Sequence, residues 1–174
     1  MFIRILSMTF LLACGSAALA GSERSAPDFR LQDQNGEWHA LSDYAGDWLV
    51  VYFYPRADTP GCTTEACNFR DNIYAFRGVG AEVLGISTDP VDAQKAFSDK
   101  YSLPFAILSD ADGRVAAEYG VLVERGEINF ARRETFLIGP DGQIVKHYSQ
   151  VDPESHTDEV LADLQSARAA ADAL

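Results

Sequence analysis

The chain has 174 residues, of which 47% are hydrophobic and 11% aromatic, and this composition suits one globular domain with a sizeable core. Its formal net charge is −12 and its lysines and arginines are scattered, so nucleic acid phosphates and anionic lipid headgroups would repel it. Nucleic acid is therefore excluded as a partner.

Residues 1–20 have the organisation of a secretory signal peptide. A basic residue, Arg4, precedes an apolar stretch, and a small-residue cleavage site ends at Ala20. The stretch LLAC, which ends at Cys14, also resembles a bacterial lipoprotein cleavage box. The alternative is therefore a lipoprotein signal over residues 1–13 with Cys14 lipidated, and a buried N-terminal helix is a further alternative.

Both processing routes predict that the remaining domain, residues 21–174, is exported, and the expected compartment is the periplasm. Membrane attachment follows only if Cys14 is lipidated. Cleavage after Ala20 leaves Cys62 and Cys67 as the only thiols. In an oxidising compartment such a pair is either a structural disulfide or a redox couple.

A hairpin and a central strand are the first elements that the pattern predicts. The stretch FRLQDQNGEWHAL, residues 29–41, carries Asn35-Gly36 between short alternating segments, which is a strong hairpin signal. The stretch WLVVYFY, residues 48–54, is a continuous apolar run, which predicts a strand covered on both faces. Pro55 ends this strand.

An amphipathic helix follows, and Cys62 lies at its start. Apolar residues recur along one face at steps of four, three, four and three. The members of this face are Cys62, Ala66, Phe69, Ile73 and Phe76.

Strands and helices then alternate to the end of the chain. Further strands are predicted at 82–88, 105–109, 134–138 and 143–148, with the turn GPDG between the last two. Residues 122–132 show no clear periodicity, which predicts a loop.

Three more helices are expected between and after these strands. Asp89-Pro90 suits an N-cap followed by a first-turn proline, and a short helix at 114–120 is stopped by its last residue, Gly120. The last helix starts near Asp152-Pro153. The residues expected on the buried faces of the first and last of these helices are Ala93, Phe97, Tyr101, Val160, Leu161 and Leu164.

This order of elements predicts an α/β protein with a mixed central β-sheet, helices on both faces and an N-terminal β-hairpin. Such an arrangement is a thioredoxin-like fold. The sequence shows no internal repeat and no second domain.

The position of Cys62 favours a reactive thiol. A free cysteine has a pKa of about 8.5, so little thiolate is present at neutral pH without help. Cys62 follows Gly61 in the first turn of the predicted helix, where unpaired backbone N–H groups favour an anion. A nearby cation would add to this effect, but local sequence does not identify one.

The spacing of the two thiols bears on how they pair. Five residues along an ideal helix separate two Cα atoms by roughly 8.6 Å, whereas a disulfide tolerates about 4.4 to 6.8 Å. Cys62 and Cys67 therefore cannot bond while an intact helix carries both, and pairing would require the first turns to unwind. If the helix starts after Cys62, the pair could instead be bridged at rest.

The stretch YFYPRADTPGCTTEACNFRD, residues 52–71, resembles the peroxiredoxins. Their signature is Pro, three residues, Thr, two residues and Cys, which Pro55, Thr59 and Cys62 fill here. A second cysteine five residues later, at Cys67, is similar to the bacterioferritin comigratory or Q-type class. The stretches VLGISTDP, LPFAILSDADGRVAAEYGV and RRETFLIGPDG extend the resemblance over roughly residues 25 to 165.

The resemblance implies a thioredoxin-dependent peroxidase of the atypical two-cysteine kind, which acts on hydrogen peroxide and organic hydroperoxides in antioxidant defence. Cys62 would be the peroxidatic cysteine and Cys67 the resolving cysteine, which form an intramolecular disulfide. Thr59 and Arg133 would hold the peroxide oxygens. Pro55 would shield the pocket and the sulfenic acid.

Further expectations concern the surroundings of this site. Glu65 would orient Arg133, or it is only an acid that suits the first turn of a helix. Arg132 is expected to point to the opposite face of its strand from Arg133. The implied partners are a hydroperoxide and a thioredoxin-like reductant, and the protein is expected to be a monomer. No phosphate-binding loop or dinucleotide fingerprint occurs, and the three scattered histidines suit the surface or helix caps, so no cofactor and no metal are expected.

Two other functions remain alternatives. A thioredoxin-like disulfide reductase uses two cysteines separated by two residues, whereas four residues separate Cys62 from Cys67. A non-catalytic exported binding domain would keep the fold and a structural disulfide. The complete set of signature residues argues against it.

Overall fold

The structure, a computed structural model, describes residues 24–126 and 128–173. The predicted signal segment, with its alternatives of cleavage after Ala20 or lipidation of Cys14, lies outside the described residues. Within these residues, no helix is long and apolar enough to cross a membrane.

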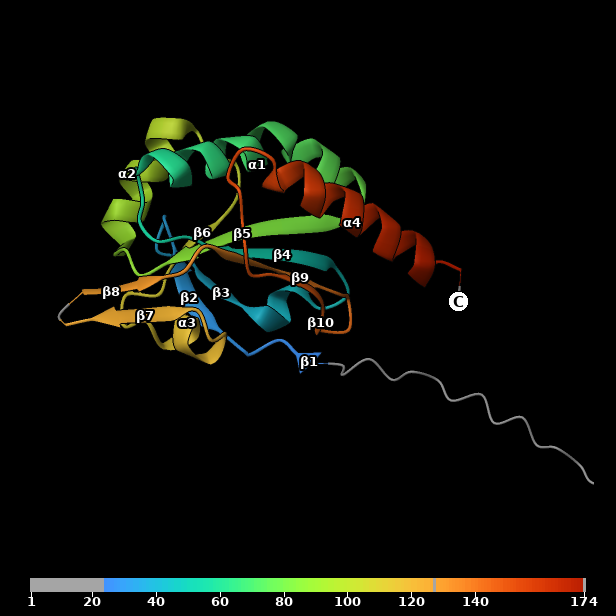
Figure 1. The fold of residues 1–174 in the computed structure, drawn as a ribbon, viewed down its shortest axis with the longest axis horizontal. Helices are drawn as coiled ribbons and strands as arrows, with labels where there is room; N and C mark the ends of the chain where they lie inside the picture. The colour runs from blue at the N-terminus through green and yellow to red at the C-terminus, as the bar shows by residue number, and fades with distance from the viewer. Residues whose placement is uncertain (1–23, 127, 174) are drawn as a thin grey trace, which may run out of the picture.

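An eight-stranded mixed sheet forms the centre of the molecule (Figure 1). The strands β4, β5 and β6 pair in parallel, and the remaining pairs are antiparallel. In spatial order the strands are β1 (Arg24–Ser25), β10 (Gln143–Tyr148), β9 (Glu134–Ile138), β4 (Trp48–Phe53), β5 (Ala81–Ser87), β6 (Ile107–Ser109), β2 (Arg30–Asp33) and β3 (Trp38–Ala40).

Helices cover both faces of this sheet, as the sequence predicted. The upper face in Figure 1 carries α1 (Pro60–Gly78), α2 (Val91–Tyr101) and α4 (His156–Ala171), and the lower face carries α3 (Arg114–Glu118). A short 3-10 helix, η1 (Leu41–Tyr44), follows β3. Each face of the sheet therefore has its own hydrophobic cluster, one with Phe69 of α1 and one with Val115 of α3.

The central strand β4 shows why this sheet is covered on both sides. All six of its residues are buried, with Val50 and Tyr52 in the cluster under α1 and Val51 and Phe53 in the cluster over α3. A continuous apolar run has this consequence because successive side chains point to opposite faces of a sheet. The interpretation of residues 48–54 as a central strand is confirmed, one residue shorter.

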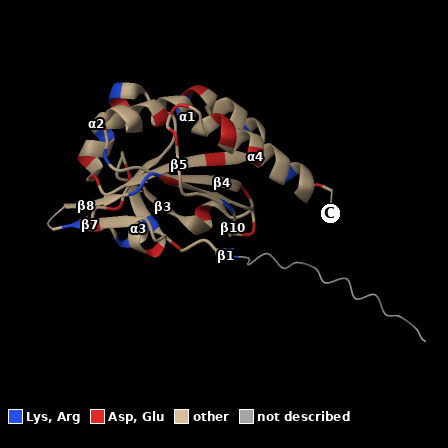
Figure 2. Cartoon of the chain, in the orientation of Figure 1, with Lys and Arg blue, Asp and Glu red and all other residues tan. Residues whose placement is uncertain are grey.

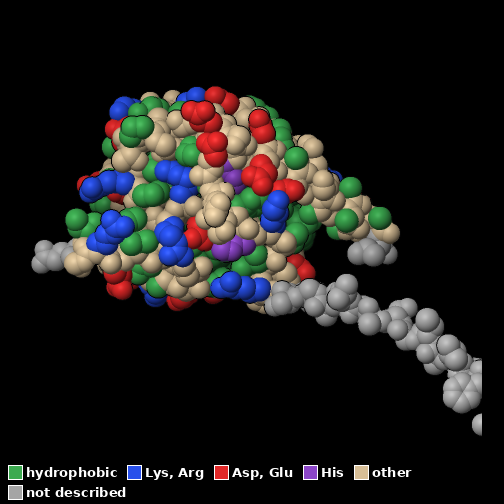
Figure 3. All heavy atoms as spheres, viewed as in Figure 1, with side chains coloured by type: hydrophobic (Ala, Val, Ile, Leu, Met, Phe, Trp, Pro, Cys, Tyr) green, Lys and Arg blue, Asp and Glu red, His purple; other side chains and the backbone are tan. Residues whose placement is uncertain are grey.

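Acidic and basic side chains are interspersed over the elements of the fold (Figures 2 and 3). Several are paired across the surface, such as Lys95 with Asp99 and Arg114 with Glu118. Exposed pairs of this kind contribute little to stability.

Two predictions for the second half of the chain were wrong. Residues 122–132 are not a loop but a separate hairpin, with β7 (Leu122–Arg125) paired to β8 (Ile128–Ala131). Most residues of this hairpin are exposed or half-buried. Its sequence therefore lacks the strict alternation of apolar and polar residues that indicates a half-buried strand.

The start of α2 also differs from the prediction. Pro90 is the N-cap of α2, and the Asp89 carboxylate instead accepts hydrogen bonds from the backbone N–H of Ala57 (2.7 Å) and from the Ser87 hydroxyl (2.8 Å). Phe97 is buried as expected. The helix also buries Gln94, which an apolar pattern does not reveal.

The last helix, α4, begins at His156, three residues after Pro153. Val160 and Leu164 are buried in it, whereas Leu161 is only half-buried. The N-terminal hairpin is confirmed, with Gly36 at a φ of +79° in its turn, a conformation that favours glycine.

Candidate active site

The end of β4 and the start of α1 carry the predicted reactive thiol. The chain leaves β4 at Phe53 and enters α1 at Pro60, so Cys62 is the third residue of the helix. Its side chain is buried, with 1% exposed. The helix therefore begins before Cys62, and the first-turn position predicted from the sequence is confirmed.

Local sequence explains why the helix starts here. Thr59 is the N-cap in an extended conformation, and Pro60 occupies the first turn, where its fixed φ suits a helix and its missing N–H costs nothing. The Thr59 carbonyl accepts the first helical hydrogen bond from Thr63 N–H at 2.8 Å. Its hydroxyl does not cap the helix but donates to the Arg56 carbonyl at 3.0 Å.

Arg133 supplies the cation that local sequence could not identify. It lies just before β9, and its Nη2 donates to the Cys62 sulfur at 3.2 Å. Its Nη1 pairs with Glu65, one helical turn after Cys62. The neighbouring Arg132 pairs instead with Glu134, on the other side of the strand, as expected.

Glu65 is the buried acid of this group. Its side chain has no exposed surface, and burial raises its pKa to about 7 although Arg133 opposes the rise. One carboxylate oxygen pairs with Arg133, and the other, Oε1, has no hydrogen-bond partner among the described residues. The structure thus places Glu65 where it can orient Arg133, and not merely at the surface of a first turn.

Gly61 leaves room for the guanidinium. A Cβ atom at this position would lie 3.3 Å from Arg133 Nη2 and 3.6 Å from Pro153. The first contact is tighter than ordinary packing, so an alanine at this position would require the Arg133 guanidinium to shift by a few tenths of an ångström.

Cys67 lies on the same continuous helix as Cys62, and both thiols are free. Cys67 is half-buried, whereas Cys62 is buried. Helix geometry separates their Cα atoms by roughly 8.6 Å, beyond the reach of a disulfide. Pro55 is half-buried directly after Tyr54, on the loop from β4 to the helix.

The loop that precedes Cys62 is held by residues that sequence reasoning missed. Asp58 has a φ of +59°, and its carboxylate accepts hydrogen bonds from Lys100 at 2.7 Å and from the Tyr101 hydroxyl at 2.7 Å. Asp is one of the residues that tolerate this backbone region, which is the only local signal. No pattern could have paired Asp58 with residues more than forty positions away.

His156 departs from the expectation for the histidines. It is 1% exposed, packs edge-on against Phe69 and Tyr148, and shares a hydrogen bond of 2.8 Å with the Thr135 hydroxyl. Burial, with the charge of Arg133 next in importance, lowers its pKa to about 4. His156 is therefore a core residue that is uncharged at neutral pH, and not a surface residue.

One group among the described residues has donors of the kind that hold metals. Asp33, Glu37 and His39 each bring a ligand atom within 4.8 Å of the others. The Asp33 carboxylate already accepts the backbone N–H groups of Asn35 and Glu37 and so stabilises the β2–β3 turn. This local structural role accounts for the position of Asp33.

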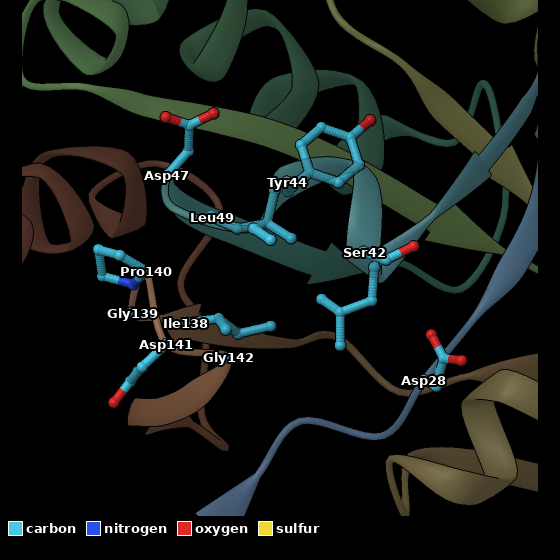
Figure 4. A pocket seen from close by; sticks show the side chains of 12 residues that line it. Asp28, Ser42, Tyr44, Asp47, Leu49, Ile138, Gly139, Pro140, Asp141 and Gly142 are labelled. Atoms are coloured by element: carbon cyan, nitrogen blue, oxygen red, sulfur yellow. The ribbon is translucent and has the colours of Figure 1, made fainter.

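A pocket of about 340 Å³ lies away from Cys62, at the opposite ends of the same strands (Figure 4). It is lined by Leu49 at the start of β4 and Ile138 at the end of β9, with Tyr44 and Pro140 beside them. Cys62 follows the end of β4 and Arg133 precedes β9. The pocket is therefore separate from Cys62 and Arg133.

Comparisons with known proteins agree with this geometry. The family model described as the AhpC/TSA family matches residues 23–147. A protein of Sedum lineare named peroxiredoxin Q, chloroplastic, is 45% identical over 141 residues, which are 80% of this chain and 75% of that protein. A putative peroxiredoxin bcp of Coxiella burnetii is 42% identical over 145 residues, 81% of this chain and 96% of that protein.

A solved structure extends the similarity to three dimensions. The crystal structure of peroxidoxin BcpB from Mycobacterium tuberculosis has a TM-score of 0.78 and 39% identity, and the match covers 83% of this chain and 96% of that one.

Proposed function

The chain belongs to the AhpC/TSA family and is a peroxiredoxin of the Q, or bacterioferritin comigratory, class, and on this premise we propose that Cys62 is its peroxidatic cysteine. It has the thioredoxin-like fold of that class and is a thiol-dependent peroxidase, an oxidoreductase. Its family implies a peroxide substrate and a thioredoxin-type reductant.

The contact between Arg133 and the Cys62 sulfur carries the assignment. A guanidinium 3.2 Å from the sulfur and the N-terminal turn of α1 both place positive charge beside the atom that attacks the peroxide. The thiolate attacks one peroxide oxygen and forms an S–O bond. The O–O bond breaks, and the other oxygen leaves as hydroxide or alkoxide and takes a proton from solvent.

Thr59 and Arg133 stabilise the charge that moves onto the leaving oxygen. Arg133 is next to the sulfur already, and its two donors are charged and partly removed from water. The Thr59 hydroxyl donates to the Arg56 carbonyl at rest and would turn to the peroxide when it binds. Pro55 limits the access of water to the sulfenic acid that forms.

Cys67 resolves the sulfenic acid. Its thiolate attacks the Cys62 sulfur, an S–S bond forms, and the hydroxyl leaves as water with a proton. Because both cysteines lie on intact α1, the first turns of the helix must unwind for this bond to form. Glu65 orients Arg133 while the thiol is reduced.

We further infer that the domain is exported. The support is the sequence of residues 1–20, with cleavage after Ala20 or lipidation of Cys14. Expression in a bacterial host followed by fractionation and mass spectrometry of the mature N-terminus tests this part. An intact N-terminal methionine on cytoplasmic protein would contradict it.

Replacement of the reactive thiol tests the assignment of Cys62. Cys62→Ser should abolish peroxide turnover, because a hydroxyl supplies almost no anion near neutral pH. The measurement is peroxide consumption with excess dithiothreitol, with wild type as the reference. Activity within tenfold of wild type would show that another group reduces the peroxide.

A further inference from the structure

One side of α1 runs from the half-buried Cys67 and Arg70 to the exposed Asp71 and Tyr74. Cys67, Arg70, Asp71 and Tyr74 lie at positions i, i+3, i+4 and i+7, so they share one side of the helix. We call these four residues the Cys67 face. Tyr74 is 84% exposed, more than Trp38, Ile128 or Val145, the other large exposed hydrophobic residues of the described chain.

The opposite side of α1 fixes this orientation. Ala66, Phe69, Ile73 and Phe76 are each at most 1% exposed and form part of the core under the helix. Because Ile73 and Phe76 are held in the core, Tyr74 points to solvent, next to the exposed Ala75. Among the described residues, no ring stacks on Tyr74 and no hydrogen bond engages its hydroxyl.

The charges of the Cys67 face are already paired. Arg70 donates to Asp71 at 2.8 Å and to the Tyr101 carbonyl at 2.8 Å. The arginine thus links α1 to the end of α2 and leaves a surface with little net charge. Tyrosine and arginine are both enriched at the centres of protein interfaces.

From these observations, and resting on the Cys62–Cys67 disulfide of the proposed function, we propose that the part of the Cys67 face beyond the segment that unwinds, Asp71 and Tyr74, is the docking surface of the thioredoxin-type reductant. Tyr74 is its main contact. The occupant follows from the chemistry, because a protein dithiol that reduces this disulfide must bring its thiolate within bonding distance of one of the two sulfurs.

Cys67 is the sulfur that the reductant attacks. In the reduced protein Cys62 is buried, and Arg133 is positioned to stabilise it as a thiolate when it leaves. The reductant's thiolate forms a bond to the Cys67 sulfur, the Cys62–Cys67 bond breaks, and its electron pair stays on Cys62.

The second thiolate of the reductant completes the exchange. It attacks the reductant's own bridged sulfur, the bond to Cys67 breaks, and Cys67 leaves with the electron pair. The reductant ends as a disulfide, the two electrons have reduced Cys62 and Cys67, and the two protons of the dithiol pass through solvent.

An interface of ordinary size centred on Cys67 would include Tyr74. A partner covers about 800 Å² of each surface, which is a patch of roughly 16 Å radius around the point of attack. Tyr74 lies two turns from Cys67, a rise of about 10.5 Å along the helix. Ile73 and Phe76 hold this part of α1 in the core, so Tyr74 stays in place when the first turns unwind.

Steady-state kinetics with two reductants test the proposal. Hydroperoxide consumption is measured with reduced bacterial thioredoxin and its reductase, and separately with dithiothreitol, which needs no docking surface. Tyr74→Ala should raise the KM for thioredoxin by about tenfold, as expected for an interface contact of this kind. The rate of Cys62 oxidation and the turnover with dithiothreitol should stay within about twofold of wild type.

Trp38→Ala is the matched control, because Trp38 is also an exposed aromatic residue, 53% exposed, but lies on the edge strand β3. It should leave all three measurements unchanged. An unchanged KM for thioredoxin in Tyr74→Ala, or an equal rise in Trp38→Ala, would overturn the proposal.

Other outcomes separate the parts of the argument. If wild type turns over with dithiothreitol but not with thioredoxin, the occupant is wrong while the peroxidase assignment stands. If wild type consumes no peroxide with either reductant, the proposed function itself fails. If sedimentation shows a wild-type dimer that Tyr74→Ala dissociates, the Cys67 face binds a second copy of the chain and the docking proposal is wrong.

Discussion

Replacing Arg133 with alanine should slow the reaction of Cys62 with peroxide by about 10²- to 10³-fold. The guanidinium lies 3.2 Å from the Cys62 sulfur and also pairs with Glu65. At that distance and an effective dielectric constant of about 20, the Coulomb energy of two unit charges is about 5 kcal/mol. Glu65 shares the same cation, so the usable part is smaller. Loss of a preorganised donor costs about 2.7 to 4 kcal/mol in comparable sites, which gives the expected range of rates.

The assay must separate chemistry from folding. Arg133→Ala leaves the buried Glu65 carboxyl without its partner, and an unpaired buried charge costs about 3 to 5 kcal/mol unless the group takes up a proton. The thermal stability of each variant is therefore measured alongside its kinetics. The rate of Cys62 oxidation is measured by rapid quench, with the remaining thiol trapped by alkylation and quantified by mass spectrometry. Arg132→Ala is the control, since Arg132 is adjacent but pairs with Glu134. A folded Arg133→Ala protein that reacts within tenfold of wild type, or an equal loss in Arg132→Ala, would refute the reasoning.

Three further predictions concern resolution and pH. Peroxide treatment should lower amide hydrogen-exchange protection over residues 62–70 while β4 stays protected. Cys67→Ser should stop at the sulfenic acid and over-oxidise. Equal protection in the reduced and oxidised states, with an intramolecular disulfide confirmed by peptide mapping, would contradict the unwinding. Burial raises the pKa of Glu65 from 4.5 to about 7, so the folded state holds this proton more tightly than the unfolded state. About 3 kcal/mol of stability that is present below pH 4.5 should therefore be lost as the pH rises to 7. In denaturant titrations Glu65→Gln should not show this loss. The pKa of His156, lowered by burial from 6.5 to about 4, has the opposite sign, so about 3 kcal/mol should be lost as the pH falls from 6.5 to 4; an identical acid limb in His156→Gln would show that other groups cause it.

The fold class, the family and the first-turn position of Cys62 could be predicted from the amino-acid sequence alone. Each of these depends on local information. The apolar run of β4 predicted a doubly covered strand, and the spacing from Cys62 to Phe76 predicted one face of α1. The signature around Cys62 is itself a continuous stretch, because a β-strand, a tight loop and a helix N-terminus build the thiol's environment from neighbouring residues.

The groups that reach Cys62 from elsewhere in the chain could not be predicted from its local sequence. Arg133 is 71 positions from Cys62, and it reaches the sulfur because β9 pairs with β4 in one register. From the residues alone, its role rested on a family resemblance. The contact of Asp58 with Lys100 also depends on tertiary structure, because it requires α2 to lie beside the loop that precedes Cys62.

Burial of polar residues was likewise a tertiary outcome. Glu65 and His156 are polar, and nothing in their local pattern distinguishes them from surface residues. Glu65 is buried because α1 packs its first turns against the sheet where Arg133 arrives, and His156 because α4 lies against α1 at Phe69. Hydrophobic periodicity reports where apolar side chains go, whereas the placement of a buried charge depends on a partner that the chain brings from a distance.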